Sequence, residues 1–286
     1  MNIKKENHVW DHIIEPKSSL FRFNVKEVWR YRDLLNLLLR RDFVSIYKQT
    51  ILGPIWFFIQ PIMSTIVFTI IFGKVANLST DGIPKPLFYL SGIVLWNFFS
   101  EAMVKSSETF VSFSNIFSKV YFPRLIAPLS IVISSSFKFF VQFLLLIFLY
   151  GYYYIFKGGL GNINMIFLLF PILILILALL SLGFGLIISS LTTKYRDLRF
   201  LIQYGVQLLM YVSPIVYPLS IAPEKFKIFL IINPMTGIIE TFRYSLFSVG
   251  EFQPVLLFYS LIISVLVFFL GVFTFNKVER NFIDVI

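Results

Sequence analysis

Few charged residues of this chain could do chemistry, and one of them lies inside a long apolar run. Residues 125–156 contain a single charged residue, Lys138. A charge at the centre of a membrane helix costs at least about 2.5–3.5 kcal/mol, so its presence needs an explanation. Lys138 lies roughly 27 Å along a helix from the outer end of this run, near the inner headgroups, where we expect its ammonium to snorkel. Ser135, Lys138 and Gln142 share one helical face, which we expect to meet a neighbouring helix rather than a proton path.

Other reactive side chains are missing or poorly placed for catalysis. The chain has no cysteine, and its two histidines, His8 and His12, lie in a charged N-terminal stretch that we interpret as a solvated tail. The sequence contains no G-x-x-x-x-G-K-[ST] nucleotide loop and no H-E-x-x-H metal motif. No acidic pair lies within an apolar run to relay protons. We therefore predict no catalytic residue, no metal site and no cofactor bound by this chain, and an energy source outside it.

The apolar runs are the elements that must position the remaining polar residues. Four of them, 51–72, 158–193, 200–223 and 252–276, contain no charged residue, and about 20 apolar residues suffice for a helix to cross a bilayer. Hydrophobic residues make up 57% of the chain, above the roughly 45–50% of soluble domains. The sequence predicts an all-α integral membrane protein with six transmembrane helices. These are expected at about 51–72, 87–104, 125–156, 163–191, 200–219 and 254–275.

Basic residues indicate how these helices are oriented. Six spans place both termini on one side, and the segments on that side hold 18 Lys and Arg residues, against 6 in the segments on the other. The first set comprises 1–50, 105–124, 192–199 and 276–286, and the second comprises 73–86, 157–162 and 220–253. Because cytoplasmic loops are enriched in Lys and Arg, we predict cytoplasmic termini. Basic residues that cluster at span ends favour lipid headgroups over nucleic acid as partners.

Residues 1–49 are predicted to form a cytoplasmic tail and a surface helix, ahead of a membrane domain over 50–286. The helix is expected over 25–46, with Asn24 as its N-cap. It is basic and amphipathic, with Trp29 on its apolar side, and too charged to span. Such a helix suits the plane of the membrane surface; the alternative is an ordinary helix packed on a soluble partner.

A second amphipathic helix is predicted over 105–122, between the second and third spans. Phe110, Phe113 and Phe117 form its apolar face, while Glu108 and Lys119 suit its N- and C-terminal ends. An amphipathic helix of this kind can dock into a groove of a partner protein. The alternative is a helix that lies flat on the bilayer.

The segment 220–250 is irregular, and we predict two short half-helices that dip into the outer bilayer. Asn233 as N-cap and Pro234 at the first helical position are a strong helix start. The following helix carries Glu240 and Arg243 on one side.

Five stretches in order along the chain resemble the membrane subunit of ATP-binding-cassette exporters of surface polysaccharides, the permeases for O-antigen, capsule and teichoic acid. They are Arg41-Asp42-Phe43 with Tyr47 to Trp56 and Pro61, Phe122-Pro123-Arg124 with Pro128, Tyr195-Arg196-Asp197-Leu198, Ser213 to Tyr217, and Asn233-Pro234-Met235-Thr236. The resemblance runs from about residue 30 to the C-terminus. Each stretch alone is weak, but five in order within a six-span chain are specific.

The resemblance implies a homodimer of permease chains in the bacterial cytoplasmic (inner) membrane, with two ATPase subunits that bind ATP and Mg²⁺. It implies that 105–122 is a coupling helix received by the ATPase and that 220–250 forms an outer gate. A lipid-linked polysaccharide would pass through a channel between the permeases.

These implied roles fall on named residues. The coupling residues would be Glu108, Phe110, Phe113, Phe117 and Lys119. The outer gate would include Asn233, Pro234, Glu240 and Arg243. Aromatic side chains near span ends could face sugar rings along the channel, and the candidates are Trp56, Trp96, Tyr211, Tyr217 and Tyr244.

The main hypothesis is therefore a permease subunit for lipid-linked, O-antigen-like polysaccharide. An exporter of teichoic acid, capsule, small lipids or drugs on the same scaffold is the first alternative. A membrane glycosyltransferase is less favoured, because it needs carboxylates clustered at one membrane face. Glu101 and Glu108 are the only acids of the predicted inner loops between the surface helix and Asp197.

Overall fold

The computed structural model describes residues 25–48, 51, 53–117, 119–120, 122–157, 163–195, 197–250 and 252–281. These residues form helices, turns and loops, and no strand occurs among them. The prediction of an all-α protein is confirmed. The N-terminal tail, His8, His12 and the N-cap Asn24 lie outside the described residues.

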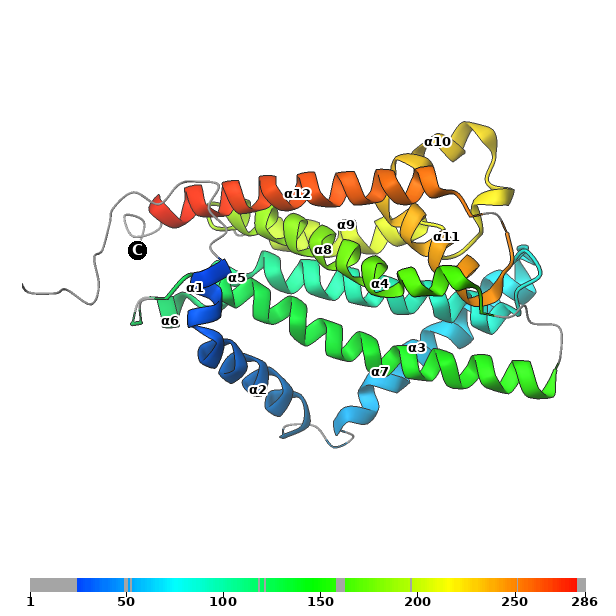
Figure 1. Cartoon of the computed structure of the whole chain (residues 1–286), viewed down its shortest axis with the longest axis horizontal. Coiled ribbons are helices and arrows are strands. Elements are labelled where there is room, and N and C mark those ends of the chain that lie inside the picture. The colour runs from blue at the N-terminus through cyan, green and yellow to red at the C-terminus, as the bar shows by residue number, and fades with distance from the viewer. Residues whose placement is uncertain are drawn as a thin grey trace, which may run out of the picture.

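Five helical stretches in the described part of the chain are long and apolar enough to cross a membrane. They are Gly53–Val75 (η1 Gly53–Ile55, α3 Trp56–Phe68 and η2 Thr69–Val75), α4 (Lys85–Ser107), α7 (Ile126–Phe156), Met165–Thr192 (η3 Met165–Leu169 and α8 Phe170–Thr192) and Pro254–Glu279, which is most of α12 (Pro254–Asn281). Helices α4, α7, α8 and α12 run alongside one another along the longest axis of the molecule (Figure 1). Within its most apolar stretch α4 is 78% buried and the Gly53–Val75 stretch only 17%, so α4 is the central helix.

The predicted fifth span differs most from the expectation. Helix α9 (Leu198–Tyr211) has 14 residues, about 21 Å at 1.5 Å per residue, which is short of the roughly 30 Å apolar core of a bilayer. Turns follow, up to η4 (Leu219–Ile221). The continuous helix expected over 200–219 is not formed, because Pro214 and Pro218 lack the N–H that a helix needs and disfavour helical geometry in the residue before each.

The helix predicted over 105–122 is also broken. Helix α4 continues to Ser107, and two single turns follow, α5 (Thr109–Ser112) and α6 (Ser114–Phe117). The hydroxyls of Ser107, Thr109 and Ser114 donate to carbonyls three residues back, at 2.6, 2.7 and 2.9 Å. Such local bonds compete with a regular helix, which explains why a serine-rich segment forms short turns. Ser118 and Tyr121 lie outside the described residues.

The N-terminal amphipathic region forms two helices, α1 (Val25–Arg30) and α2 (Arg32–Lys48), where one was expected. Helix α2 packs on α7 through an edge-to-face contact of Phe43 and Phe137, whose ring centroids are 5.2 Å apart. Leu38 is buried in a small cluster with residues of the α5–α6 segment and the start of α7. Trp29 stays 69% exposed, which fits both a helix at the membrane surface and a helix that packs on a partner protein.

Contacts between distant segments define the two ends of the bundle. At the α5 end, the Thr192 hydroxyl donates to the Ser107 carbonyl at 2.9 Å, and Arg124 pairs with Glu279 at 3.8 Å. At the α11 end, the Ser220 hydroxyl donates to the Asp81 carboxylate at 2.8 Å. Helices α1 and α2 lie toward the α5 end, and α10 (Glu224–Ile232) and α11 (Pro234–Phe247) form the other (Figure 1).

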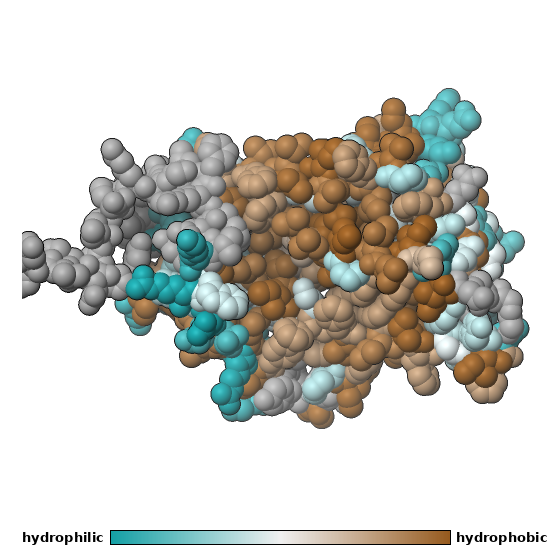
Figure 2. Space-filling model, viewed as in Figure 1, coloured by the Kyte–Doolittle hydropathy of each residue, from teal (hydrophilic) through white to brown (hydrophobic). Residues whose placement is uncertain are grey.

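An apolar belt covers the middle of the bundle, with polar residues at its two ends (Figure 2). Inside the belt, α8 and α12 approach closely at two glycines. A Cβ on Gly183 would stand 2.7 Å from the Phe268 nitrogen, and one on Gly271 would stand 2.5 Å from the Gly183 carbonyl oxygen. Small residues that let backbones touch are a common device of membrane helix packing.

Candidate functional site: an aromatic pocket with polar neighbours

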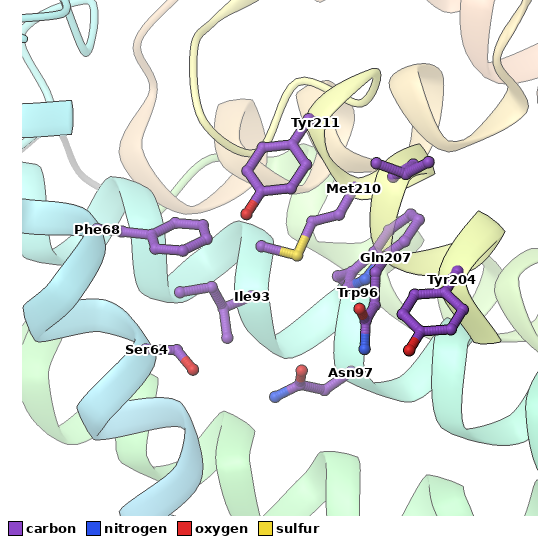
Figure 3. Close-up of a pocket in the computed structure, with 10 residues that line it drawn as sticks. Ser64, Phe68, Ile93, Trp96, Asn97, Tyr204, Gln207, Met210 and Tyr211 are labelled. Atoms are coloured by element: carbon purple, nitrogen blue, oxygen red, sulfur yellow. The ribbon is translucent and has the colours of Figure 1, made fainter. Parts of the chain in front are cut away.

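A pocket of about 360 Å³ lies between α3, α4 and α9. Side chains from all three helices point into it (Figure 3). It is lined by Ser64 and Phe68 of α3, Ile93, Trp96 and Asn97 of α4, and Tyr204, Gln207, Leu208, Met210 and Tyr211 of α9. Aromatic faces mixed with amide and hydroxyl groups can hold a ligand that is apolar on its faces and polar at its edges, such as a sugar ring.

Two of the aromatic residues predicted to line a channel, Trp96 and Tyr211, lie in this pocket. Tyr217 donates a hydrogen bond to the Tyr211 carbonyl at 3.1 Å and so supports the pocket's edge. Trp56 is the first residue of α3 and is 48% exposed, and Tyr244 stacks on Phe252 at 6.0 Å; neither lines the pocket. A role for these five residues in substrate binding stays a prediction.

Sequence reasoning missed Tyr204 and Gln207. Tyr204, Gln207 and Tyr211 are spaced at i, i+3 and i+7, which places them on one face of α9. That spacing within an otherwise apolar helix was a usable signal. It is clear only once α4 is known to lie opposite this face.

A polar cluster adjoins the pocket and shares Asn97 with it. Lys138 of α7 donates to the Glu101 carboxylate of α4, and Lys105 donates to the same carboxylate at 2.6 Å. One helical turn from Lys138, the Gln142 side-chain oxygen accepts a hydrogen bond from Asn97 at 3.3 Å. The expected meeting of this face of α7 with a neighbouring helix is confirmed. The expected snorkelling of Lys138 is replaced by an ion pair, and its side chain is 14% exposed.

The outer segment is organised around Asn233 and Arg243. The Asn233 side chain accepts from the Met235 N–H at 3.0 Å and donates to the Ser213 hydroxyl at 2.9 Å. It therefore caps α11, as predicted, and also ties α11 to the turn after α9. The two sequence stretches around Ser213 and Asn233, 20 residues apart, meet at this point.

Arg243 is 2% exposed and holds three segments together. Its guanidinium donates to the backbone carbonyls of Pro214 and Ile215 and of Phe88, and to the Ser91 hydroxyl. It also lies 3.6 Å from the centroid of the Phe88 ring, a cation–π contact.

Glu240 faces the same region but makes a separate contact. Its carboxylate accepts from the Leu219 N–H at 3.3 Å. Among the described residues, Glu240 and Arg243 form no ion pair with each other, so each fastens α11 to a different neighbour. Pro234 occupies the first turn of α11, as predicted. The role of these residues in gating stays a prediction.

The predicted coupling residues are split between the interior and the surface. Phe110 is 1% exposed and stacks on Phe275 of α12 at 4.5 Å. Phe113 is 4% exposed and lies under the Arg41 guanidinium, 4.9 Å from its ring centroid. Phe117 is half-buried beside Arg124.

Those three rings bind the segment to its own chain and are not an open docking face. Glu108 is half-buried at the break between α4 and α5, and Lys119 is exposed. Exposed residues of the segment, such as Ser112 and Val120, remain free to meet a partner. The coupling role of the predicted residues stays a prediction.

A bundle of long apolar helices with a pocket of aromatic and polar residues between them is typical of a multi-pass membrane protein. Comparison with known families then gives a more specific assignment. The chain belongs to the ABC-2 type transporter family, whose match covers residues 33–247.

Curated relatives carry names from polysaccharide transport. The O-antigen export system permease protein RfbA of Klebsiella pneumoniae is 27% identical over 260 residues, covering 89% of this chain and 95% of the relative. The RfbA of Myxococcus xanthus is 26% identical over 222 residues, 77% of this chain and 82% of the relative. The polysialic acid transport protein KpsM of Escherichia coli is 21% identical over 250 residues, which cover 85% of this chain and 92% of the relative.

Family membership sets the class of activity. The chain is a transporter permease subunit and not an enzyme, as the sequence predicted. Membership also implies that an ATPase subunit is its partner.

Proposed function

We propose that this chain is the permease subunit of an ATP-driven exporter that carries lipid-linked, O-antigen-like polysaccharide across the cytoplasmic membrane. The proposal rests mainly on the aromatic pocket between α3, α4 and α9. Its lining combines aromatic rings with two amides: Trp96, Tyr204, Tyr211, Asn97 and Gln207. Sugars have apolar C–H faces and polar edges, and this pocket offers groups for both. The relatives named as O-antigen export permeases support the same substrate class.

The channel is formed by two copies of the chain. The Gly53–Val75 stretch is largely uncovered, and Val206 is the one buried residue of α9, a helix that is described throughout. Gln207 and Ser64 would face hydrocarbon if lipid covered the pocket, and a polar group buried without a partner is costly. A second copy placed against α3 and α9 would enclose these groups in a shared, hydrated path.

The ATPase, in two copies, binds ATP and Mg²⁺ and docks at the α5 end. Ser112 at the end of α5 is exposed, as are Lys119 and Val120 after α6. The phenylalanines of the segment anchor it on α2, α7 and α12. Motion of the ATPase would thus be transmitted to the helices that these rings contact. The bias of Lys and Arg toward this end supports a cytoplasmic location for it and for both termini, in the inner membrane.

The outer gate is formed by the α11 end. Arg243 and Asn233 hold α11 against α4 and the turn after α9, next to the edge of the aromatic pocket that Tyr211 and Tyr217 form. Displacement of α11 would therefore open or close the outer side of the same path.

Capsule export is the second candidate, because the polysialic acid transport protein KpsM also matches most of the chain. Both candidates require a lipid-linked glycan and the same path.

Deletion of the gene tests the proposal. Surface polysaccharide and intracellular lipid-linked polymer are compared in the deletion strain and the parent. Loss of surface glycan with accumulation inside is expected, and the composition of the accumulated polymer separates O-antigen from capsule. Normal surface glycan without accumulation would refute polysaccharide export and favour a small-lipid or drug exporter on the same scaffold.

A further inference from the structure

The cluster of Glu101, Lys105 and Lys138 carries more positive charge than its structure needs. One carboxylate accepts both ammonium groups, so the cluster bears a net charge of about +1. One lysine would be enough to neutralise Glu101. Asp42 of α2 lies within electrostatic range of Lys105 but is paired with Arg41 at 3.1 Å. The Lys105 side chain is 52% exposed, so its ammonium can also meet an anion from outside the cluster.

The space beside the cluster is lined by polar side chains. A cavity of about 230 Å³ is bounded by the three charged residues together with Gln60, Asn97, Ser100 and Gln142. The two ammoniums can only donate, whereas the three amides can donate as well as accept. The Ser100 hydroxyl already donates to the Asn97 carbonyl at 3.4 Å, and the one carboxylate faces the lysines. Drug-sized ligands occupy roughly 300–1,000 Å³, so this cavity suits one small charged group.

The position of the cavity suggests what that group belongs to. Glu101 lies six residues before the end of α4, about 9 Å from the α5 end, which is near the depth of lipid headgroups. Asn97 belongs both to this cavity and to the aromatic pocket. A ligand seated here would place its anionic group beside the aromatic rings of Trp96 and Tyr204.

We infer that this cavity binds the phosphate groups that join a lipid carrier to its glycan, with Lys105 and Lys138 as the cationic contacts. The inference rests on the proposed function and assigns a second part of the same site. Lysine binds phosphate as a point charge, and the amides of Gln60 and Asn97 supply further donors. Glu101 keeps the cavity from carrying two uncompensated positive charges when it is empty.

Binding of farnesyl pyrophosphate to the purified full-length chain in nanodiscs tests the inference, with farnesol as the probe that has the same tail and no phosphate. Lys138→Gln and Lys105→Gln should each weaken pyrophosphate binding about tenfold, or ~1.4 kcal/mol, and leave farnesol binding unchanged. Lys157→Gln, the matched control, removes an exposed lysine just beyond the far end of α7 and should change neither. Equal binding of the two probes, or wild-type affinity in both lysine variants, would overturn the inference.

Glu101→Gln separates a binding site from a structural ion cluster. This variant breaks both ion pairs but keeps both lysines, so a phosphate site predicts pyrophosphate binding as tight as in the wild type or tighter. If the cluster is purely structural, Glu101→Gln should lose pyrophosphate affinity to the same extent as Lys138→Gln. That result would overturn the inference. Lys138→Arg keeps the charge and should retain binding, which guards against a folding defect in the glutamine variant.

Lipid composition identifies the source of the phosphate. Adding phosphatidylglycerol to phosphatidylcholine nanodiscs should leave the affinity for farnesyl pyrophosphate unchanged. Competition by phosphatidylglycerol that Lys138→Gln abolishes would mean that a phospholipid headgroup occupies the cavity, and would overturn the assignment to the carrier. The proposed function is judged separately. If the deletion strain fails to export glycan but the purified chain does not bind pyrophosphate, only this inference is refuted.

Discussion

At the scale of single residues, Arg243 is a buried side chain that joins segments far apart in the sequence. Its guanidinium bonds to three carbonyls from two separate segments and to a serine hydroxyl. The fixed fork of five N–H donors makes this possible, and the single ammonium of lysine cannot reproduce it. Gly92 makes the room, because a Cβ there would stand 2.9 Å from an Arg243 nitrogen and 3.1 Å from Ile215.

Replacing Arg243 by lysine should destabilise the protein and impair export. The variant keeps the positive charge but leaves buried carbonyls without a donor, and we expect a loss of about 2–3 kcal/mol in the free energy of unfolding. Gly92→Ala should produce a milder form of the same defect by displacing the guanidinium. Arg40→Lys, at an exposed position of α2, is the control. Melting temperatures in detergent check the prediction, and an Arg243→Lys protein as stable as Arg40→Lys would contradict it.

At the scale of elements, close helix packing depends on particular glycines. Gly183 and Gly271 let α8 and α12 touch backbone to backbone, whereas a Cβ on Gly151 of α7 would meet nothing within 4 Å. Gly183→Ala should therefore cost about 1–3 kcal/mol through overpacking, and Gly151→Ala should be neutral or slightly stabilising. Thermal melts of the two variants make a matched comparison. Equal melting temperatures would mean that the two helices can move apart freely.

The elements also mark the limit of what could be predicted from the sequence. Long apolar runs predicted the spans well: the spans predicted at 51–72 and 125–156 correspond to the helical stretches Gly53–Val75 and Ile126–Phe156. Length and hydropathy, which determine membrane insertion, are local properties of a run. The pairing of Lys138 with Glu101 depends on how α7 and α4 are rotated toward each other, which is set by packing across the whole bundle.

The α5–α6 segment illustrates the same limit for a candidate site. Its phenylalanine spacing predicted an apolar face, and the rings of Phe110 and Phe113 are indeed buried together with parts of α12, α2 and α7. The sequence could not tell burial against the same chain from burial against a partner. Serine and threonine hydroxyls that break the helix were visible in the sequence but compatible with either outcome.

Docking of the ATPase should accordingly depend on exposed residues of this segment. Val120 is apolar and 57% exposed, so Val120→Asp should reduce co-purification of the ATPase by about tenfold, or ~1.4 kcal/mol, without lowering the melting temperature. Val75→Asp alters another exposed valine at the α11 end, 79% exposed, and should not affect ATPase binding. Phe113→Asp should instead lower the melting temperature, because it buries a charge among Leu38 and Ile126. Full ATPase recovery with Val120→Asp would place the docking surface elsewhere.

At the scale of the whole molecule, the number of membrane crossings depends on α9. Five long helices alone would put the termini on opposite sides of a membrane. Yet the Ser220 hydroxyl binds the Asp81 carboxylate, and Arg124 pairs with Glu279 near the end of α12. The chain therefore travels from one end of the bundle to the other along α9 and the turns after it, despite the short helix. Side chains satisfy the backbone of those turns, since Asn233 donates to the Val212 carbonyl and Arg243 to the Pro214 and Ile215 carbonyls, as non-helical backbone at membrane depth requires.

Single-cysteine labelling decides whether α9 and its turns cross the bilayer, and the natural chain has no cysteine that would need to be removed first. Lys119→Cys and Lys277→Cys should react only when an impermeant maleimide reaches the cytoplasm, while Ser79→Cys and Lys227→Cys should react in spheroplasts. All four positions are exposed. Lys85 is a poorer outer site because its ammonium binds the Gly73 carbonyl. If α9 stays on the inner side, Lys227→Cys reacts only when the maleimide reaches the cytoplasm, like Lys119→Cys. Lys277→Cys then reacts in intact spheroplasts. That pattern would refute the six-crossing topology and, with it, cytoplasmic placement of both termini.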